Sequence, residues 1–212
     1  AYFGPIPSGK EKIERVSVVE PPMEGEIRDT VYDDIQLPGV MMAYRIPAQG
    51  TDDFYALEMM SMVLSDGESS RLNKKCVENT QSAMYVGSFP FPCEHPGLSF
   101  VFGLANADTD PLILEKEINE EMDLIQNELI TDIELQKIRN MIENDFIYNF
   151  SSMIGIAENL ANYKMYFGDA GLINNELERY FKVTKEDIMR VAKKYFHRDN
   201  RVVLYYLPKE EG

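Results

Sequence analysis

The fold is decided by residues 40–67, which read VMMAYRIPAQGTDDFYALEMMSMVLSDG. The stretch begins with mostly apolar residues that end at a proline, which is typical of a short buried strand. Thr51 can cap a helix, and the two aspartates after it suit the positive end of the helix dipole. Apolar side chains then recur at helical spacing, at Phe54, Leu57, Met60 and Leu64. A buried strand followed by an amphipathic helix is therefore expected.

Other segments have the pattern of strands. Together with residues 40–46, strands are predicted at residues 27–35, 82–89, 98–105 and 202–207. Residues 27–35 alternate without a cleanly apolar face, and a Pro38-Gly39 turn separates them from residues 40–46. These two strands are therefore expected to form an antiparallel pair.

Helices fill most of the second half of the chain. Besides the helix that starts at Thr51, helices are predicted at residues 69–78, 110–129, 131–146, 152–167, 172–181 and 184–195. Thr131 and Glu134 have the spacing of a capping box. Paired strands with helices grouped after them indicate an α+β fold. We expect one mixed, largely antiparallel sheet with helices packed on one face.

The N-terminal residues differ in composition from the rest. Residues 1–22 are rich in proline and glycine and are interpreted as an interdomain linker and entry segment, with an extended piece at residues 15–19. Residues 23–212 are expected to form a single α+β domain.

The charge of the chain excludes several classes of function. The formal net charge is −15, so neither nucleic acid nor an anionic membrane surface is an expected partner. No apolar run approaches the ~20 residues that a bilayer requires, and no signal-peptide pattern is visible. Cys76 and Cys93 are interpreted as free thiols. The expected protein is soluble, with the compartment left open between cytoplasm and periplasm.

Metal-binding residues are scarce. His95 and His197 are the two histidines of the chain, whereas a catalytic zinc usually has three protein ligands. His197 is expected to complement the dipole at the end of the last helix. The Cys93-Glu94-His95 loop is short for wrapping one ion with all three side chains. No catalytic residue and no metal site are therefore expected.

Other conspicuous residues have ordinary structural interpretations. The acidic run is expected to be a solvated helix face: Glu115, Glu117, Glu120 and Glu121. Met59, Met60 and Met62 are expected to fill the core. Ser69 or Ser70 is expected to cap the helix at residues 69–78. Alternatively, the exposed start of that helix and Arg71 contact a carboxylate of a peptide or of a neighbouring domain.

Three stretches are distinctive when they are taken together. The first is Tyr2-Phe3-Gly4-Pro5-Ile6-Pro7. The second runs from Pro47 through Asp53 and Ala56-Leu57 to Leu64-Ser65-Asp66-Gly67-Glu68-Ser69-Ser70-Arg71-Leu72. The third runs from Tyr195-Phe196 through Asn200-Arg201 to Tyr205-Tyr206-Leu207-Pro208. In this order they resemble the insulinase, pitrilysin and mitochondrial processing peptidase family of zinc metallopeptidases, with the first stretch similar to the segment that joins the halves of these proteins.

The resemblance implies one of two homologous halves that form a clam-like chamber. In the family, one half carries His-x-x-Glu-His on its first helix, and the metal lowers the pKa of its bound water toward about 7. In this chain the matching positions are Tyr55, Glu58 and Met59, a degenerate motif. The chain therefore resembles the non-catalytic C-terminal half, with no cofactor of its own and with zinc expected in the partner half.

Some relatives use an Arg and a Tyr, seven residues apart, to bind the substrate carbonyl from the second half. The matching positions in this chain are Val77 and Met84, which depart from that pattern. Arg71 and Tyr85 remain the candidate substrate-binding residues.

Three functions are compatible with this resemblance. The first is the non-catalytic half of a zinc peptidase, which closes the chamber and helps bind peptide substrates for the zinc-bearing half, in the same polypeptide or a separate subunit. The second is a scaffold or assembly subunit of the same fold without peptidase activity. The third is a stand-alone peptide-binding module.

Overall fold

Five strands form one open sheet in the computed structural model, which describes residues 4–7, 9–11 and 20–209. The strands are β1 (Ile27–Asp33), β2 (Gly39–Ile46), β3 (Ala83–Pro90), β4 (Gly97–Ala105) and β5 (Arg201–Pro208). They lie in the order β1-β5-β2-β4-β3, and only β1 and β5 are parallel within this sheet. The mixed, largely antiparallel sheet is confirmed. The extended piece expected at residues 15–19 lies outside the described residues.

The expected antiparallel pairing of the first two strands is wrong. β5 lies between them: it pairs in parallel with β1, where Ile27 opposes Val202, and antiparallel with β2, where Val40 opposes Tyr205. Burial explains the order, because nearly all of β1 is exposed whereas Val203 of β5 is fully buried. The more apolar C-terminal strand occupies the interior of the sheet, and β1 is left at the edge.

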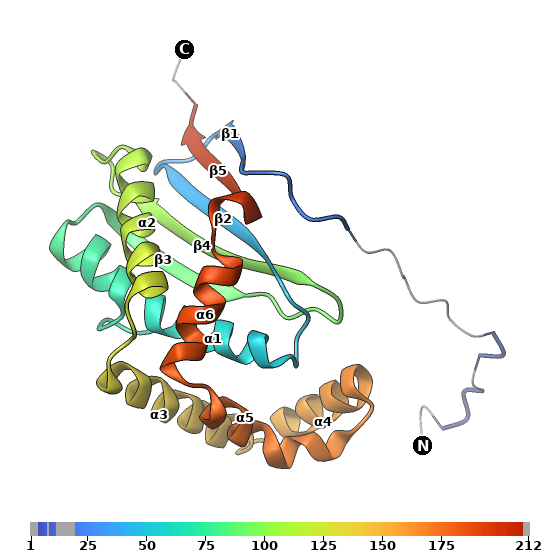
Figure 1. Cartoon of the computed structure of the whole chain (residues 1–212). Helices are drawn as coiled ribbons and strands as arrows, with labels where there is room; N and C mark the ends of the chain where they lie inside the picture. Colours follow the sequence, from blue (N-terminus) through green and yellow to red (C-terminus); the bar gives the residue numbers. More distant parts are fainter. Residues whose placement is uncertain (1–3, 8, 12–19, 210–212) are drawn as a thin grey trace.

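Helices cover one face of the sheet, as expected (Figure 1). The α-helices are α1 (Asp52–Ser65), α2 (Pro111–Asn127), α3 (Asp132–Asn149), α4 (Met153–Phe167), α5 (Glu176–Lys182) and α6 (Lys185–Tyr195). Short turns are η1 (Asn73–Asn79), η2 (Ala170–Asn175) and η3 (Arg198–Asn200). The strands are contacted by α1, α2 and α6. The helices α3 and α5 pack against α1. α4 lies beside η2, away from the sheet (Figure 1).

Side-chain caps fix several helix starts. Thr51 accepts a hydrogen bond from the Phe54 N–H, and the capping box of Thr131 and Glu134 is confirmed. The cap expected from Ser70 is wrong, since its Oγ is buried without a hydrogen-bond partner. The segment that follows is the π-helical turn η1, which has no side-chain cap.

The core lies between α1 and the helix-facing side of the sheet. In β2 the alternate side chains are buried, at Val40, Met42, Tyr44 and Ile46. Met59 and Met60 are fully buried and Met62 packs partly against them, which confirms their role as core residues.

The opposite face of the sheet stays exposed and apolar. We call it the open sheet face: Met41, Tyr85, Phe89, Leu98, Phe100, Phe102 and Leu104. Its rings contact one another, with centroids 5.7 Å apart for Tyr85 and Phe102 and 5.5 Å apart for Phe89 and Phe100. Phe89 is 45% exposed and Met41 is 41% exposed. No described helix lies on this face of the sheet (Figure 1).

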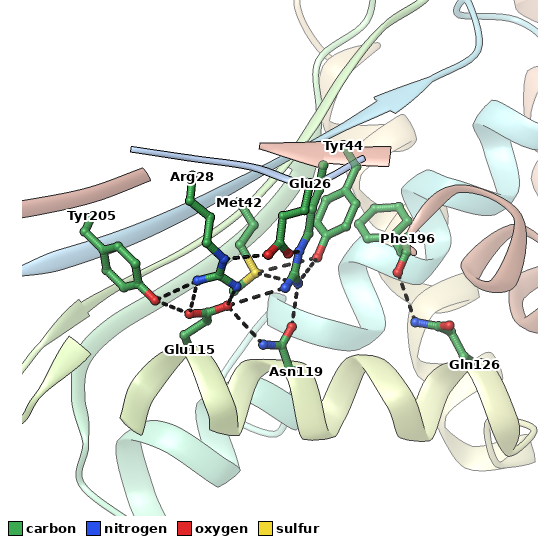
Figure 2. A network of polar contacts seen from close by, with 10 residues as sticks. Glu26, Arg28, Met42, Tyr44, Glu115, Asn119, Gln126, Phe196 and Tyr205 are labelled. Carbon is green, nitrogen blue, oxygen red and sulfur yellow. Dashed lines mark hydrogen bonds and ion pairs between the residues drawn. The ribbon is translucent and has the colours of Figure 1, made fainter. Parts of the chain in front are cut away.

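A polar network fastens α2 to the edge of the sheet (Figure 2). Glu115 of α2 accepts bonds from Arg28 at 2.6 and 3.0 Å, and also from the Tyr205 hydroxyl. Arg201, whose side chain is 3% exposed, donates to Asn119 at 2.6 Å and forms an ion pair with Glu115 at 3.4 Å. The expectation of a solvated acidic face is therefore wrong for Glu115, because two strand arginines compensate its buried charge.

The same network holds the chain as it enters the domain. Glu26 pairs with Arg28 and Arg201, and Glu20 pairs with Arg45 of β2 at 2.5 Å. Arg45 also bonds the carbonyl of Pro21. Ionic contacts thus bind residues 20–26 to the sheet.

Candidate functional site

The degenerate zinc-motif positions on α1 belong to a closed set of contacts with α5. The Tyr55 hydroxyl donates to Glu176 Oε1 at 2.9 Å and accepts from Arg179 at 3.1 Å. Glu58 Oε2 accepts from the Tyr180 hydroxyl at 2.5 Å. The rings of Tyr55 and Tyr180 meet edge to face, 4.8 Å apart. α5 therefore occupies the polar side of α1.

These side chains do not fit a zinc ion. Met59 is fully buried in the core, so its thioether faces apolar neighbours. Tyr55 supplies a hydroxyl that is already engaged by Glu176 and Arg179, and burial raises its pKa, which disfavours the phenolate. Zinc in proteins takes imidazole, thiolate and carboxylate ligands. Of these, only Glu58 stands at the motif positions.

A groove of about 480 Å³ opens beside Glu58. It is lined by α1, α3, α4, α5 and the last residues of β3. Phe146, Tyr163 and Tyr180 are its aromatic lining residues on the helices, and Ser88, Phe89 and Pro90 line it at the end of β3. Glu58 and Glu176 lie at one part of the groove, and both also line a smaller hollow of about 130 Å³ next to Tyr55.

Burial dominates the electrostatics of this groove. Burial raises the pKa of Glu58 to about 7, with the nearby charge of Glu176 adding to the rise and the Tyr180 hydrogen bond opposing it. Burial likewise raises the pKa of Glu176, against the hydrogen bond from Tyr55 and the charge of Arg179. Asp66 lines the groove too, and burial raises its pKa with a further contribution from Asp145. The carboxyl groups therefore lie in surroundings that disfavour their negative charge.

Sequence reasoning did not find most of these residues. Glu58 and Tyr180 are 122 residues apart in the sequence, and no motif links them. Glu176 and Tyr163 lie in short or exposed helical segments without a distinctive pattern. Only Tyr55, Glu58 and Met59 had a signal, through their place on the first helix.

A family model for the peptidase M16 inactive domain matches residues 1–142. The chain belongs to this family. Its resemblance to zinc metallopeptidases of the processing-peptidase type, as their non-catalytic half, is thereby confirmed. Tyr55 and Met59, at the positions expected to match the zinc motif, are not histidines, which agrees with the inactive character of the family.

This inactive M16 domain is similar to proteins described as proteases and to other inactive M16 domains. The zinc protease PqqE of Helicobacter pylori is 26% identical over 190 residues, which are 89% of this chain and 43% of that protein. A solved protease from Helicobacter pylori has a TM-score of 0.88 at 25% identity, covering 94% of this chain and 48% of its own. A solved peptidase M16 inactive domain from Pseudomonas fluorescens has a TM-score of 0.79 at 15% identity, covering 92% and 46%. The chain spans less than half of each relative's length.

Arg71 of the M16 domain is held by a carboxylate within the chain. Its guanidinium donates to Glu134 at 2.7 and 3.1 Å, and its side chain is 18% exposed. The alternative in which Arg71 contacts the carboxylate of another molecule thus competes with this two-bond pair. Glu134 also closes the capping box of α3, so the pair joins the start of η1 to α3.

Tyr85 lies on β3, the edge strand of the sheet, and is 54% exposed. Its neighbour Met84 is 63% exposed, whereas Val77 packs partly against the core. Among the described residues, no hydrogen bond or ring contact joins Tyr85 to Arg71. The two sequence candidates are therefore separate features, with Tyr85 on the open sheet face.

The histidines of the M16 domain are exposed. His95 lies in the loop between β3 and β4, which is tied to the chain before α1 by a 3.0 Å bond from the Gln49 N–H to the Cys93 carbonyl. His197 follows α6. Within residues 4–7, 9–11 and 20–209, no group of three Cys, His, Asp or Glu side chains is arranged to hold a metal ion. In the same residues, no helix combines the length and apolarity that crossing a bilayer requires.

Proposed function

We propose that this chain is the non-catalytic half of a zinc peptidase. It closes a substrate chamber and helps bind peptides that a homologous zinc-bearing half cleaves. One observation carries the proposal: the chain belongs to the inactive M16 family, and its α1 has Tyr55 and Met59 at the positions that we align with the two histidines of a zinc half. The zinc and its activated water then belong to the partner half, in the same polypeptide or a separate subunit.

Two exposed apolar surfaces of the domain support the proposal that it binds a partner half. The open sheet face is one of them. The other is α4 with the end of α3, where large apolar side chains are exposed: Ile147, Tyr148, Met153, Ile154 and Met165. Contiguous apolar surface of this kind marks interaction sites in soluble proteins. We propose that the zinc-bearing half covers both, and that residues 1–22 link it to the domain at residues 23–212.

The outer edge of β3 supports a mode of peptide binding. An extended peptide can join a sheet edge through main-chain hydrogen bonds, which tolerates many sequences. At Ser88 the backbone N–H and carbonyl already bond Ser65 Oγ, at 2.8 and 3.1 Å. Backbone groups alternate in direction along a strand, so Val86 shares this outward orientation. We propose that a peptide pairs with β3 at Val86, beside Tyr85.

The pairing with a zinc half is tested by sedimentation velocity. The chain is mixed with the zinc-bearing M16 half from the same source, and a one-to-one complex is expected. Met153→Asp and Ile154→Asp place charges on the exposed part of α4 and are expected to weaken the complex at least about tenfold. Glu158→Gln, also on α4, is the matched surface control. A chain that stays separate at concentrations well above 10 µM contradicts the proposal.

Peptide addition to β3 is tested by amide hydrogen exchange. An unfolded polypeptide in excess is expected to slow exchange at Val86, where a new main-chain bond forms. Ser88 is the internal control, because its N–H already has the Ser65 partner. Unchanged exchange at Val86 with saturating peptide contradicts this binding mode. If the zinc half found with this chain also lacks His-x-x-Glu-His, the scaffold function replaces the peptidase one.

A further inference from the structure

The groove beside Glu58 has negative groups and no positive one. Four carboxyl side chains line it: Glu58, Asp66, Asp145 and Glu176. No lysine, arginine or histidine is among its lining residues. Two cations lie close to it: Lys137 donates to the Asp66 carbonyl at 2.8 Å, and Arg179 donates to the Tyr55 hydroxyl, and their charges act on Asp66 and Glu176 respectively. Among the residues that the structure describes, neither cation forms a salt bridge with a carboxyl group of the groove.

Glu58 and Glu176 are under-satisfied as acceptors. An ionised carboxylate can accept about four hydrogen bonds. Glu58 receives one from Tyr180. Glu176 receives one from Tyr55 on Oε1 and also interacts with the Tyr163 side chain, while its Oε2 is buried without a partner within hydrogen-bond distance. Burial raises the pKa of both groups, because a carboxylate removed from water is costly to ionise, and for Glu176 the charge of Arg179 opposes this rise without cancelling it. A cation that entered the groove would donate hydrogen bonds to these carboxylates and would also compensate their negative charge.

The remaining walls suit the rest of a long basic side chain. Met62 and Ile142 are apolar and can pack along its methylene groups. Tyr163 and Phe146 present aromatic rings, to which cations are attracted. The groove lies at the end of β3, where Phe89 and Pro90 contribute to its lining. The pairing proposed at Val86 would place a peptide two residues from Ser88, where this lining begins.

We infer that this groove binds the cationic side chain of a peptide, a lysine ammonium or an arginine guanidinium, with Glu58 and Glu176 as its charge partners. The inference rests on the proposed function for the peptide chain that carries the side chain. It adds a preference for basic peptides, which the negative charge of the whole domain would also attract.

The test separates the cation from the peptide chain. Nα-acetyl-lysine methylamide is titrated into the chain, and the Met62 methyl and Tyr163 ring resonances are followed by NMR. Nα-acetyl-norleucine methylamide, which lacks the ammonium, is the matched ligand. We expect saturable shifts for the lysine compound, at an affinity at least about tenfold higher than for norleucine.

Variants locate the binding site. Glu58→Gln and Glu176→Gln are each expected to reduce the lysine affinity at least about fivefold while leaving norleucine unaffected. Glu143→Gln removes the same charge from the exposed side of α3 and should change neither. The inference is overturned if the lysine and norleucine compounds bind with equal affinity. It is also overturned if all three variants lose the same amount of affinity for the lysine compound. This outcome is independent of whether the chain pairs with a zinc half, which the sedimentation experiment decides.

Discussion

The Tyr180 hydroxyl donates a 2.5 Å hydrogen bond to Glu58 Oε2 and joins α5 to the first helix of the domain. In a zinc-bearing half, the matching glutamate would activate the metal-bound water. In this domain the Glu58 carboxyl group, which we expect at the matching position, is bound by a tyrosine, and Tyr55 beside it is bound to Glu176. The position has become part of a tertiary contact that holds α5 on α1.

Glu58→Gln is expected to change how stability depends on pH. Burial raises the pKa of Glu58 from 4.5 to about 7, so the folded state holds this proton more tightly than the unfolded state. The wild type therefore loses stability as pH rises from about 4.5 through 7. The variant cannot ionise, and between pH 5 and pH 8 it should gain about 2 kcal/mol relative to the wild type. Urea unfolding at both pH values measures the difference, with Glu143→Gln as control. A difference that does not change with pH contradicts the assignment.

Arg201→Met is expected to destabilise the domain by about 3–5 kcal/mol. The substitution leaves Glu115 buried with one arginine fewer and removes the bond to Asn119. Arg198→Met, on the exposed turn η3, removes the same charge and should cost less than about 0.5 kcal/mol. Chemical denaturation of the three proteins measures this, and similar stability of the two variants would show that the network in Figure 2 does not hold the sheet edge.

Glu134→Gln is expected to lower the stability of the fold near neutral pH and to leave it unchanged in strong acid. Burial tends to raise the pKa of Glu134, but the bonds from Arg71 and Thr131 outweigh it and hold the pKa at about 2. The charge therefore stabilises the fold above about pH 4.5, and this contribution is lost as pH falls toward 2. At pH 6 the variant should be less stable by about 1 kcal/mol, through the weakened cap and ion pair. Thermal unfolding at pH 6 and pH 2.5 measures the difference in stability between the wild type and the variant. A difference that is as large at pH 2.5 as at pH 6 would refute the assignment of this stability to the Glu134 charge.

The double substitution Tyr55→His and Met59→His recreates the spacing His-x-x-Glu-His without recreating a zinc site. Met59 points into the core, so a histidine there is buried among apolar side chains and should cost about 2 kcal/mol or more. Calorimetric titration with zinc, on the variant and the wild type, is expected to give no high-affinity site in either. A stoichiometric site in the variant would refute this, because it would require the side chain at position 59 to turn out of the core.

Local signals account for most of the predicted elements. Thr51, Thr131 and Thr184 cap the helices that their spacing indicated, and Asp110 caps α2 ahead of its proline. A short, mostly apolar run that ends at Pro47 identified β2, and its buried and exposed residues follow the pleat. These features depend on neighbours within a few residues, which a single sequence contains.

Contacts between segments that are far apart in the sequence could not be predicted in the same way. The place of β5 between β1 and β2 depends on burial that is gained from elements far apart in the chain. The burial of Glu115 depends on Arg28 and Arg201, which are 87 and 86 residues away. The groove at Glu58 is likewise assembled from four helices and a strand end. Only the resemblance of the first helix to a zinc motif directed attention to this region.

The most direct test of the proposed function is a peptidase assay on an unfolded fluorogenic protein, with the zinc-bearing half alone, this chain alone and the two together. We expect no turnover by this chain, at most weak turnover by the zinc half, and a rise of about tenfold or more in the mixture. The rise should vanish when the glutamate of the zinc half's His-x-x-Glu-His is changed to glutamine. Turnover by this chain alone that requires stoichiometric zinc, or a mixture no faster than the zinc half, would contradict the proposed function.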